Sequence, residues 1–250
     1  MGQVDVNVNL RSSPHIVSEV AQYDRQVLES ALEWWRDAGV DELVGDDPRD
    51  WFAKPVPAKP VDTPSDDAIP GDLDAFLAWR AGPRAPDAAW IGDGVLASGP
   101  IDAAVMVLAD VPDREDCAAG RLLTGEAGKL FDRMLAAIGL SRESVHLASL
   151  CAKRPTGGRV SRADQERLAE VARHHVGLVA PKRLLLLGDA ASRAVAGVEV
   201  LRARGRLHGI GHKGGSSEAV ASFHPRFLLE NPARKREAWA DLRLLMRGLG

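Results

Sequence analysis

After about residue 100, hydrophobic residues fall into short continuous runs separated by amphipathic segments. Four runs predict buried strands: V-M-V-L-A-D at 105–110, V-H-L-A-S-L at 145–150, R-L-L-L-L-G-D at 183–189 and A-V-A-S-F-H at 219–224. Runs without polar alternation are typical of strands that are covered on both faces. They therefore predict the central strands of a buried sheet.

Apolar residues at helical spacing predict helices between these strands. Residues 128–138 form one amphipathic segment, and Ser161-x-x-Asp164 resembles a capping box that opens the next helix. Asn231-Pro232 supplies the N-cap and first position of the last helix. Three residues of that helix are expected to face the core: Trp239, Leu242 and Leu245. Alternating strands and helices predict an α/β domain with a central, mainly parallel four-stranded sheet.

The first hundred residues differ from the rest of the chain in composition and in hydrophobic pattern. Apolar residues at helical spacing predict a helix over residues 16–38, and a short helix is expected at Asp72 to Trp79. Between them, a stretch rich in proline and aspartate is typical of an extended linker. We therefore expect an N-terminal helical extension at 1–52, a linker at 53–70 and the α/β domain at 71–250.

Composition limits the classes of protein to which the chain can belong. The 250 residues are 45% hydrophobic and 27% charged, as in soluble globular proteins. No apolar run approaches the roughly 20 residues needed to cross a bilayer, and the N-terminus lacks the pattern of a secretory signal. Two cysteines, Cys117 and Cys151, make no disulfide framework, so we expect a cytoplasmic protein without a membrane partner.

The carboxyl ends of the predicted strands bring chemically useful residues to one edge of the sheet. An acid, Asp110, ends the first strand; a hydroxyl, Ser149, ends the second; and an imidazole, His224, ends the fourth. Ligands of such sheets bind at this edge. Alone, each residue is also typical of a structural role, such as a loop-capping acid, so it is their combination that predicts a site.

Basic, glycine-rich segments surround this edge. The run K-R-P-T-G-G-R contains Lys153, Arg154 and Arg159, and further basic runs lie at 202–208 and 211–215. The net charge is −3, so any nucleic acid must bind through a local basic face of this kind. The glycine-lysine pair at 128–129 lacks the spacing of a nucleotide-binding P-loop, and the histidines and cysteines lack the spacing of a zinc site.

Several of these segments, taken in order, resemble the uracil-DNA glycosylase superfamily. They are R-L-L-T-G-E-A-G-K-L-F-D-R-M-L-A-A-I-G-L (121–140), K-R-P-T-G-G-R (153–159), P-K-R-L-L-L-L-G (181–188), R-G-R-L-H (204–208) and A-S-F-H-P-R-F-L-L (221–229). The nearest resemblance is to the bacterial and archaeal iron–sulfur branch called family 4. It covers about residues 100–247, and the first hundred residues have no recognisable counterpart.

The resemblance implies a three-layer α/β/α domain that flips a deaminated base out of DNA and hydrolyses its glycosidic bond. Asp110 stands at the acid of the family's Gly-Glu-Ala-Pro-Gly motif, where it would position water or stabilise the sugar cation. His224, in the family's His-Pro motif, would support the uracil anion as it leaves. Leu228 or Leu229 would be the wedge that fills the vacated space in the base stack.

The sequence departs from the family at the base pocket, which Ala109, Leu123 and Ser149 would line. Leu123 replaces the aromatic residue that stacks on uracil, and Ser149 replaces an asparagine. A hydroxyl cannot make the paired hydrogen bonds of an amide, which predicts altered selectivity. The four cluster-binding cysteines are absent, with Lys153 at the third position, so no iron–sulfur cluster, other cofactor or metal is expected.

We therefore expect a cluster-free glycosylase that acts on uracil in single- or double-stranded DNA in the cytoplasm, at the nucleoid. Four cations would contact phosphates: Lys153, Arg154, Arg159 and Arg226. Two alternatives stay open: a non-catalytic relative that binds DNA or a repair protein, and a glycosylase for another deaminated base. The N-terminal extension is expected to brace the core or to bind a repair partner.

Overall fold

The computed structural model describes residues 68–155 and 160–249, together with Val27, Ser30 and Trp34. The chain divides into two compact units, Met1–Val61 and Asp62–Gly250. In the first unit, the three described residues are helical and exposed. The remainder of the helix predicted over 16–38, and most of the predicted linker, lie outside the described residues.

The second unit is built on a mainly parallel sheet with the strand order β2-β1-β3-β5-β4. Four strands are parallel to one another: β1 (Val105–Ala109), β2 (Val145–Ser149), β3 (Arg183–Leu187) and β5 (Gly215–Ser222). All residues of β1 and β3 are buried. The prediction from continuous apolar runs is thus confirmed, because central strands of a covered sheet have no solvent face.

A fifth strand corrects the predicted count of four. β4 (His208–His212) pairs antiparallel with β5 at the edge of the sheet. Its sequence, H-G-I-G-H, alternates half-buried and exposed positions. The predicted basic runs at 202–208 and 211–215 overlap this strand, and its two glycines and two histidines give little signal for a strand.

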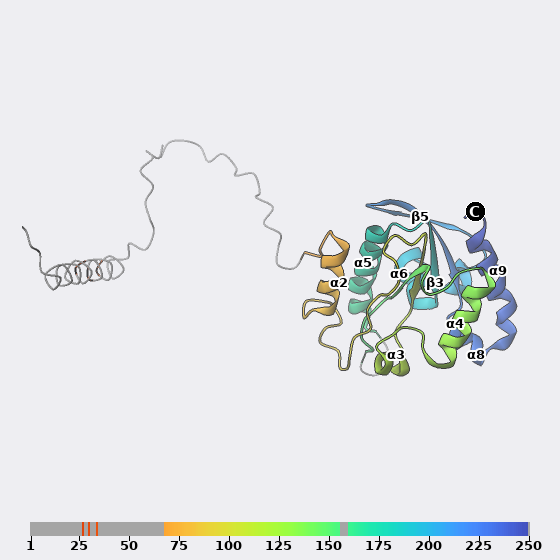
Figure 1. Ribbon diagram of the computed structural model, residues 1–250, viewed down its shortest axis with the longest axis horizontal. Helices are drawn as coiled ribbons and strands as arrows, with labels where there is room; N and C mark the ends of the chain where they lie inside the picture. The colour runs from red at the N-terminus through yellow and green to blue at the C-terminus, as the bar shows by residue number, and fades with distance from the viewer. Residues whose placement is uncertain (1–26, 28–29, 31–33, 35–67, 156–159, 250) are drawn as a thin grey trace, which may run out of the picture. The chain divides into compact units, whose positions relative to one another are not determined.

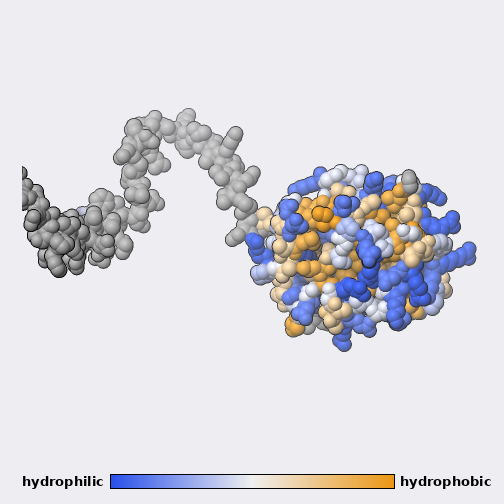
Figure 2. Space-filling view, in the orientation of Figure 1, coloured by the Kyte–Doolittle hydropathy of each residue, from blue (hydrophilic) through white to orange (hydrophobic). Residues whose placement is uncertain are grey.

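Helices cover both faces of the sheet, which confirms the three-layer arrangement. In Figure 1, α5 and α6 lie on one side of β3, while α4, α8 and α9 lie on the other. Their bounds are α4 (Gly125–Ala137), α5 (Arg162–Val179), α6 (Asp189–Ala196), α8 (Pro225–Glu230) and α9 (Lys235–Met246). The short helices α3 (Arg114–Ala119) and α7 (Val200–Ala203) lie in the connections after β1 and α6. Hydrophilic residues coat the α4 and α9 side of the domain in Figure 2, as amphipathic helices require.

Two of the predicted helix starts are close to those observed. Ser161 is the N-cap of α5, and its hydroxyl accepts a hydrogen bond from the Asp164 amide at 3.1 Å. Asn231-Pro232 opens a 3-10 turn, η1 (Pro232–Arg234), that leads into α9. Leu242 and Leu245 of α9 are buried as predicted, but Trp239 is 42% exposed and the prediction for it was wrong. Ala238 occupies the buried position instead.

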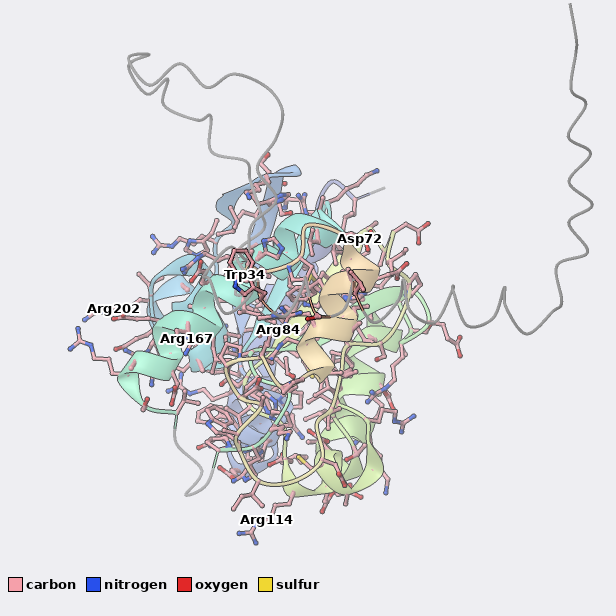
Figure 3. The ribbon with its side chains drawn as sticks, turned by 90° about the vertical axis from the view of Figure 1, so that its left-hand side faces the viewer. Trp34, Asp72, Arg84, Arg114, Arg167 and Arg202 are labelled. Carbon is pink, nitrogen blue, oxygen red and sulfur yellow. The ribbon has the colours of Figure 1, made fainter. Side chains whose placement is uncertain are left out.

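Residues before β1 form a small layer of their own on α5. The helix α2 (Leu73–Ala81) begins at its N-cap Asp72, labelled in Figure 3, and buries Phe76 and Trp79 against Val171 of α5. A buried ion pair follows between Arg80 and Asp87. No described helix is long and apolar enough to cross a membrane.

Candidate active site

The parallel register brings the ends of four strands to one edge. Ala109 of β1 lies opposite Ser149 of β2 and Leu187 of β3, and Leu187 lies opposite Ser222 of β5. Asp110 and His224 follow these positions directly or within two residues. The expectation that the acid, hydroxyl and imidazole meet at one edge is therefore confirmed, whereas their roles in catalysis stay predictions.

Asp110 is a half-buried carboxyl held at the first turn of α6. Its Oδ1 accepts a hydrogen bond from the Ala191 amide at 2.6 Å. Burial raises the pKa of Asp110 to about 6, although the Ala191 and Ala190 amides pull it down. Gly188 makes room for this carboxyl, because a Cβ at its φ of +104° would lie 2.1 Å from Oδ2. The site therefore contains an acid that changes its charge near pH 6.

A cavity of about 760 Å³ opens beside Asp110, between α5 and α6. Asp189 and Arg193 line it from α6, and Arg162 and Arg173 line it from α5. Asp189 belongs to a hydrogen-bond network, since its carboxylate accepts hydrogen bonds from Arg193 at 2.8 Å and from the Val200 amide at 3.0 Å. The cavity thus leads from solvent to the acid along a surface of mixed charge.

His224 is the N-cap of α8 and is 9% exposed. Its Nδ1 accepts a hydrogen bond from the Arg226 amide at 3.3 Å, which assigns the ring proton to Nε2. Burial, followed by the charge of Arg226, lowers the pKa of His224 to about 4. At neutral pH the ring is therefore an uncharged hydrogen-bond donor through Nε2.

A network behind the sheet edge fixes the segment that carries His224. The Ser222 hydroxyl donates to the buried Asp241 carboxylate at 2.9 Å, and Arg204 donates to the same carboxylate at 3.1 Å. The Arg204 guanidinium also lies 4.9 Å from the centre of the Phe223 ring. The basic run at 202–208 thus has a positioning role in the fold rather than only a surface charge.

The three residues predicted to line the base pocket are less accessible than expected. Ala109 and Leu123 are 3% and 2% exposed, and Leu123 has a positive φ of 53°. Arg142 holds this strained turn by donating to the carbonyl oxygens of Leu122 and Leu123. The Ser149 hydroxyl donates to the Cys151 carbonyl at 2.6 Å, so toward a ligand it can only accept.

The predicted phosphate-binding cations are engaged by the protein itself. Lys153 donates to the carbonyl oxygens of Ala88 at 2.9 Å and Trp90 at 3.3 Å, so it anchors the segment before β1. Arg154 donates to the Pro112 carbonyl at 3.2 Å, and Arg226 pairs with Asp113 at 2.6 Å. Arg159 lies outside the described residues.

The segment predicted to supply a wedge for the base stack lies in the helix α8. Leu228 is 1% exposed and packs in the core, so of the two candidate wedges only Leu229 faces solvent, and the wedge role stays a prediction. Phe227 and Leu229 are 38% and 36% exposed. A helix separates neighbouring side chains by about 100°, so one of two adjacent leucines faces the core and the other faces solvent.

Two acids near the site were missing from the predictions. Asp87 accepts hydrogen bonds from Arg80 and from the amides of Ala152 and Lys153, in the loop after β2. Asp113 bridges Arg226 and Arg154. Apart from the pairing of Asp87 with Arg80, seven positions away, these contacts join segments more than 40 positions apart in sequence, and local patterns carry no signal for them.

The side chains present do not fit an iron–sulfur cluster. Such clusters need four thiolates, whereas the chain has two cysteines. Burial raises the pKa of Cys151 well above its usual range, which keeps it a neutral thiol. Lys153, at the family's third cluster position, points its ammonium group at backbone carbonyls. In the described part of the chain, no group of three or more metal-ligating side chains occurs.

Comparison with known proteins agrees with this geometry. The family profile described as "Uracil DNA glycosylase superfamily" matches residues 96–243. Three relatives named "Type-4 uracil-DNA glycosylase" are similar: one from Archaeoglobus fulgidus, 24% identical over 56% of this chain and 74% of its own; one from Pyrobaculum aerophilum, 25% identical over 62% and 83%; and one from Thermotoga maritima, 27% identical over 55% and 72%. Since the profile matches more than half of the chain, the protein belongs to the uracil-DNA glycosylase superfamily.

Proposed function

We propose that the protein is a cluster-free DNA glycosylase that hydrolyses the bond between uracil and deoxyribose. One observation carries the proposal: a half-buried carboxyl with a pKa of about 6 and a neutral imidazole share the strand edge where ligands of such sheets bind. Membership of the superfamily and the names of the relatives support the same reaction.

The spacing of the two groups suits a flipped nucleotide. Asp110 follows β1 and His224 follows β5, with β3 between them. Neighbouring strands are about 4.8 Å apart, so these strand ends are separated by roughly 10 Å. A sugar placed near the acid and a base directed at the imidazole would span that distance.

In the proposed reaction, the oxygen of a water molecule bonds to C1′ while the bond from C1′ to uracil N1 breaks. The bonding electron pair leaves with uracil, and its charge spreads to O2. Ionised Asp110 orients the water, stabilises the sugar cation and accepts the proton that the water loses. His224 donates its Nε2 proton as a hydrogen bond to O2, and this donor costs no rearrangement because α8 already holds the ring.

Labelled oligonucleotides that contain uracil, in single and double strands, test the proposal directly. Incubation with the protein and then with alkali should cut the DNA at the uracil, because alkali cleaves abasic sites. Undamaged DNA of the same sequence should remain intact. DNA binding without cleavage of any substrate would instead support the non-catalytic alternative.

The state of Ser149 favours a second candidate, a glycosylase for another deaminated base. Its hydroxyl proton is committed to Cys151, so it offers an incoming base only an acceptor. Uracil, hypoxanthine and xanthine each have a ring N–H that such an acceptor could bind, but Ser149 lacks the donor that an amide would offer to uracil O4, so its preference for uracil is weakened. Oligonucleotides with these bases belong in the same assay, and faster release of either than of uracil would favour this candidate.

A further inference from the structure

Asp113 lies at the meeting point of three connections that leave the sheet edge. It follows β1 and precedes α3, whereas Arg154 follows β2 and Arg226 follows β5. The Asp113 carboxylate is 2.6 Å from Nη2 of Arg226 and 3.7 Å from Nη1 of Arg154. One acid thereby holds two of the four cations that were expected to meet phosphates.

The fold does not need the negative charge of Asp113 to start α3. Asp116 makes one half of a capping box, since its carboxylate accepts hydrogen bonds from the Asp113 amide at 3.0 Å and the Thr124 amide at 2.7 Å. In the other half, the Asp113 side chain accepts from the Asp116 amide, a contact that needs an acceptor but not a charge. A neutral Asn or Ser at an N-cap is as well tolerated as Asp. The two ion pairs of Asp113 are therefore separable from the helix that it begins.

The geometry of Arg226 indicates that its pairing affects the site. Its backbone amide donates to His224 Nδ1, and its side chain reaches back across the edge to Asp113. Arg226 Nε is buried without a hydrogen-bond partner in the described structure. The next residue after Asp113 provides a contrast, because the exposed Arg114 points away from the domain in Figure 3.

In an inference that rests on the proposed function, we propose that Asp113 is a specificity-determining residue that competes with DNA phosphates for Arg154 and Arg226. When the protein binds undamaged DNA, the DNA backbone passes the edge of the sheet without entering the site. The guanidinium groups of Arg154 and Arg226 then stay paired with the Asp113 carboxylate. Only a strand drawn into the site by a flipped nucleotide approaches closely enough to replace it. Asp113 thus weakens binding to undamaged DNA and raises discrimination.

Partial exposure makes this exchange feasible. The side chains of Asp113, Arg154 and Arg226 are 29%, 31% and 40% exposed. Ion pairs at such exposure are weak and screened by salt, so a phosphate can displace the carboxylate. A phosphate offers the same kind of oxygen acceptors to both guanidinium groups.

The test compares Asp113→Asn with the unaltered protein in binding to an undamaged duplex, measured by fluorescence anisotropy over a series of salt concentrations. The variant should bind about three- to tenfold more tightly at low salt. The slope of log K against log salt should become steeper by about 1 to 2, because each added phosphate contact contributes about 0.9. In the glycosylase assay, undamaged duplex should inhibit the variant at a correspondingly lower concentration.

Matched variants separate this effect from a general change of charge. Glu218→Gln removes an acid paired with Arg183 at the opposite end of the sheet, and it should leave binding unchanged. Asp113→Glu keeps the charge and should stay close to the unaltered protein. Asp113→Asn combined with Arg226→Gln should lose most of the gain. Asp113→Ser repeats the test with a second neutral cap if the Asn variant has a lower Tm.

Failure of the proposed role of Asp113 can be distinguished from failure of the proposed function. If the unaltered protein releases uracil but folded Asn and Ser variants bind undamaged DNA with the same affinity and slope as it does, the role of Asp113 is refuted and the proposed function stands. If no form releases a base, the proposed function fails. The role of Asp113 is then supported only by tighter DNA binding of the neutral variants, and equal binding refutes it too.

Discussion

Asp110 is expected to contribute to activity at a cost in stability. The folded protein holds the Asp110 proton more tightly than the unfolded chain, because burial raises its pKa from 3.8 to about 6. The free energy of unfolding therefore falls as pH rises through this interval, and the full loss of at most about 3 kcal/mol applies at pH 8. Asp110→Asn should remove that loss while slowing base release by about 10² to 10⁴-fold.

Urea unfolding at pH 8 and at pH 4, together with single-turnover cleavage, checks this expectation. The gain in stability should be present at pH 8 and largely gone at pH 4, where the acid is protonated in the folded protein and roughly half protonated in the unfolded chain. A variant that is less stable at pH 8 would mean that the hydrogen bond from Ala191 outweighs burial.

The same acid predicts how activity depends on pH. Since ionised Asp110 is the proposed base, kcat/KM should rise with pH as the carboxyl loses its proton and level off above a midpoint near 6. Burial lowers the pKa of His224 to about 4, so its ring is mostly neutral over that range. Rates measured from pH 4.5 to 8 in one buffer mixture check this, and a profile that falls through pH 6 would contradict it.

At the scale of elements, the Arg80–Asp87 ion pair joins the segment before β1 to the loop after β2. Both side chains are almost fully buried, and Asp87 also accepts from the Ala152 and Lys153 amides. Asp87→Ala should lower the free energy of unfolding by about 3 to 5 kcal/mol, because it leaves a buried arginine without its partner. Urea denaturation measures the loss; Asp132→Asn, at an exposed pair on α4, is the control.

These same elements show what the sequence could and could not predict. Continuous apolar runs located β1, β2, β3 and the end of β5, and strand polarity then placed Asp110 and His224 at one edge. Local patterns missed β4, whose pairing comes from its neighbour β5, and α8, where Pro225 begins a helix. Asp87 and Asp113 act through partners distant in sequence, and only the folded chain brings these together.

At the scale of the whole molecule, charge is unevenly distributed along the chain. Residues 1–67 contain 14 acidic and 6 basic side chains, whereas residues 68–250 contain 21 acidic and 26 basic ones. A tethered acidic segment repels DNA from the basic part of the same chain at low salt. A protein of residues 68–250 should therefore bind DNA more tightly than the full chain, and the difference should vanish as salt rises.

Anisotropy titrations of both forms at low and high salt check this expectation. A full chain that binds more tightly than residues 68–250 would instead indicate that the N-terminal residues contact DNA or recruit it. Equal Tm values of the two forms would argue against the idea that the extension braces the core.

The close approach between Gly188 and the Asp110 carboxylate has a consequence for the history and engineering of this site. The acid occupies the space that a side chain at 188 would need, so the two positions cannot vary independently. Lengthening the acid to the glutamate of the related motif would push it against the start of α6. The short acid and the glycine at 188 form a matched pair, so Asp110→Glu without a compensating change in the first turn of α6 should disturb this fit.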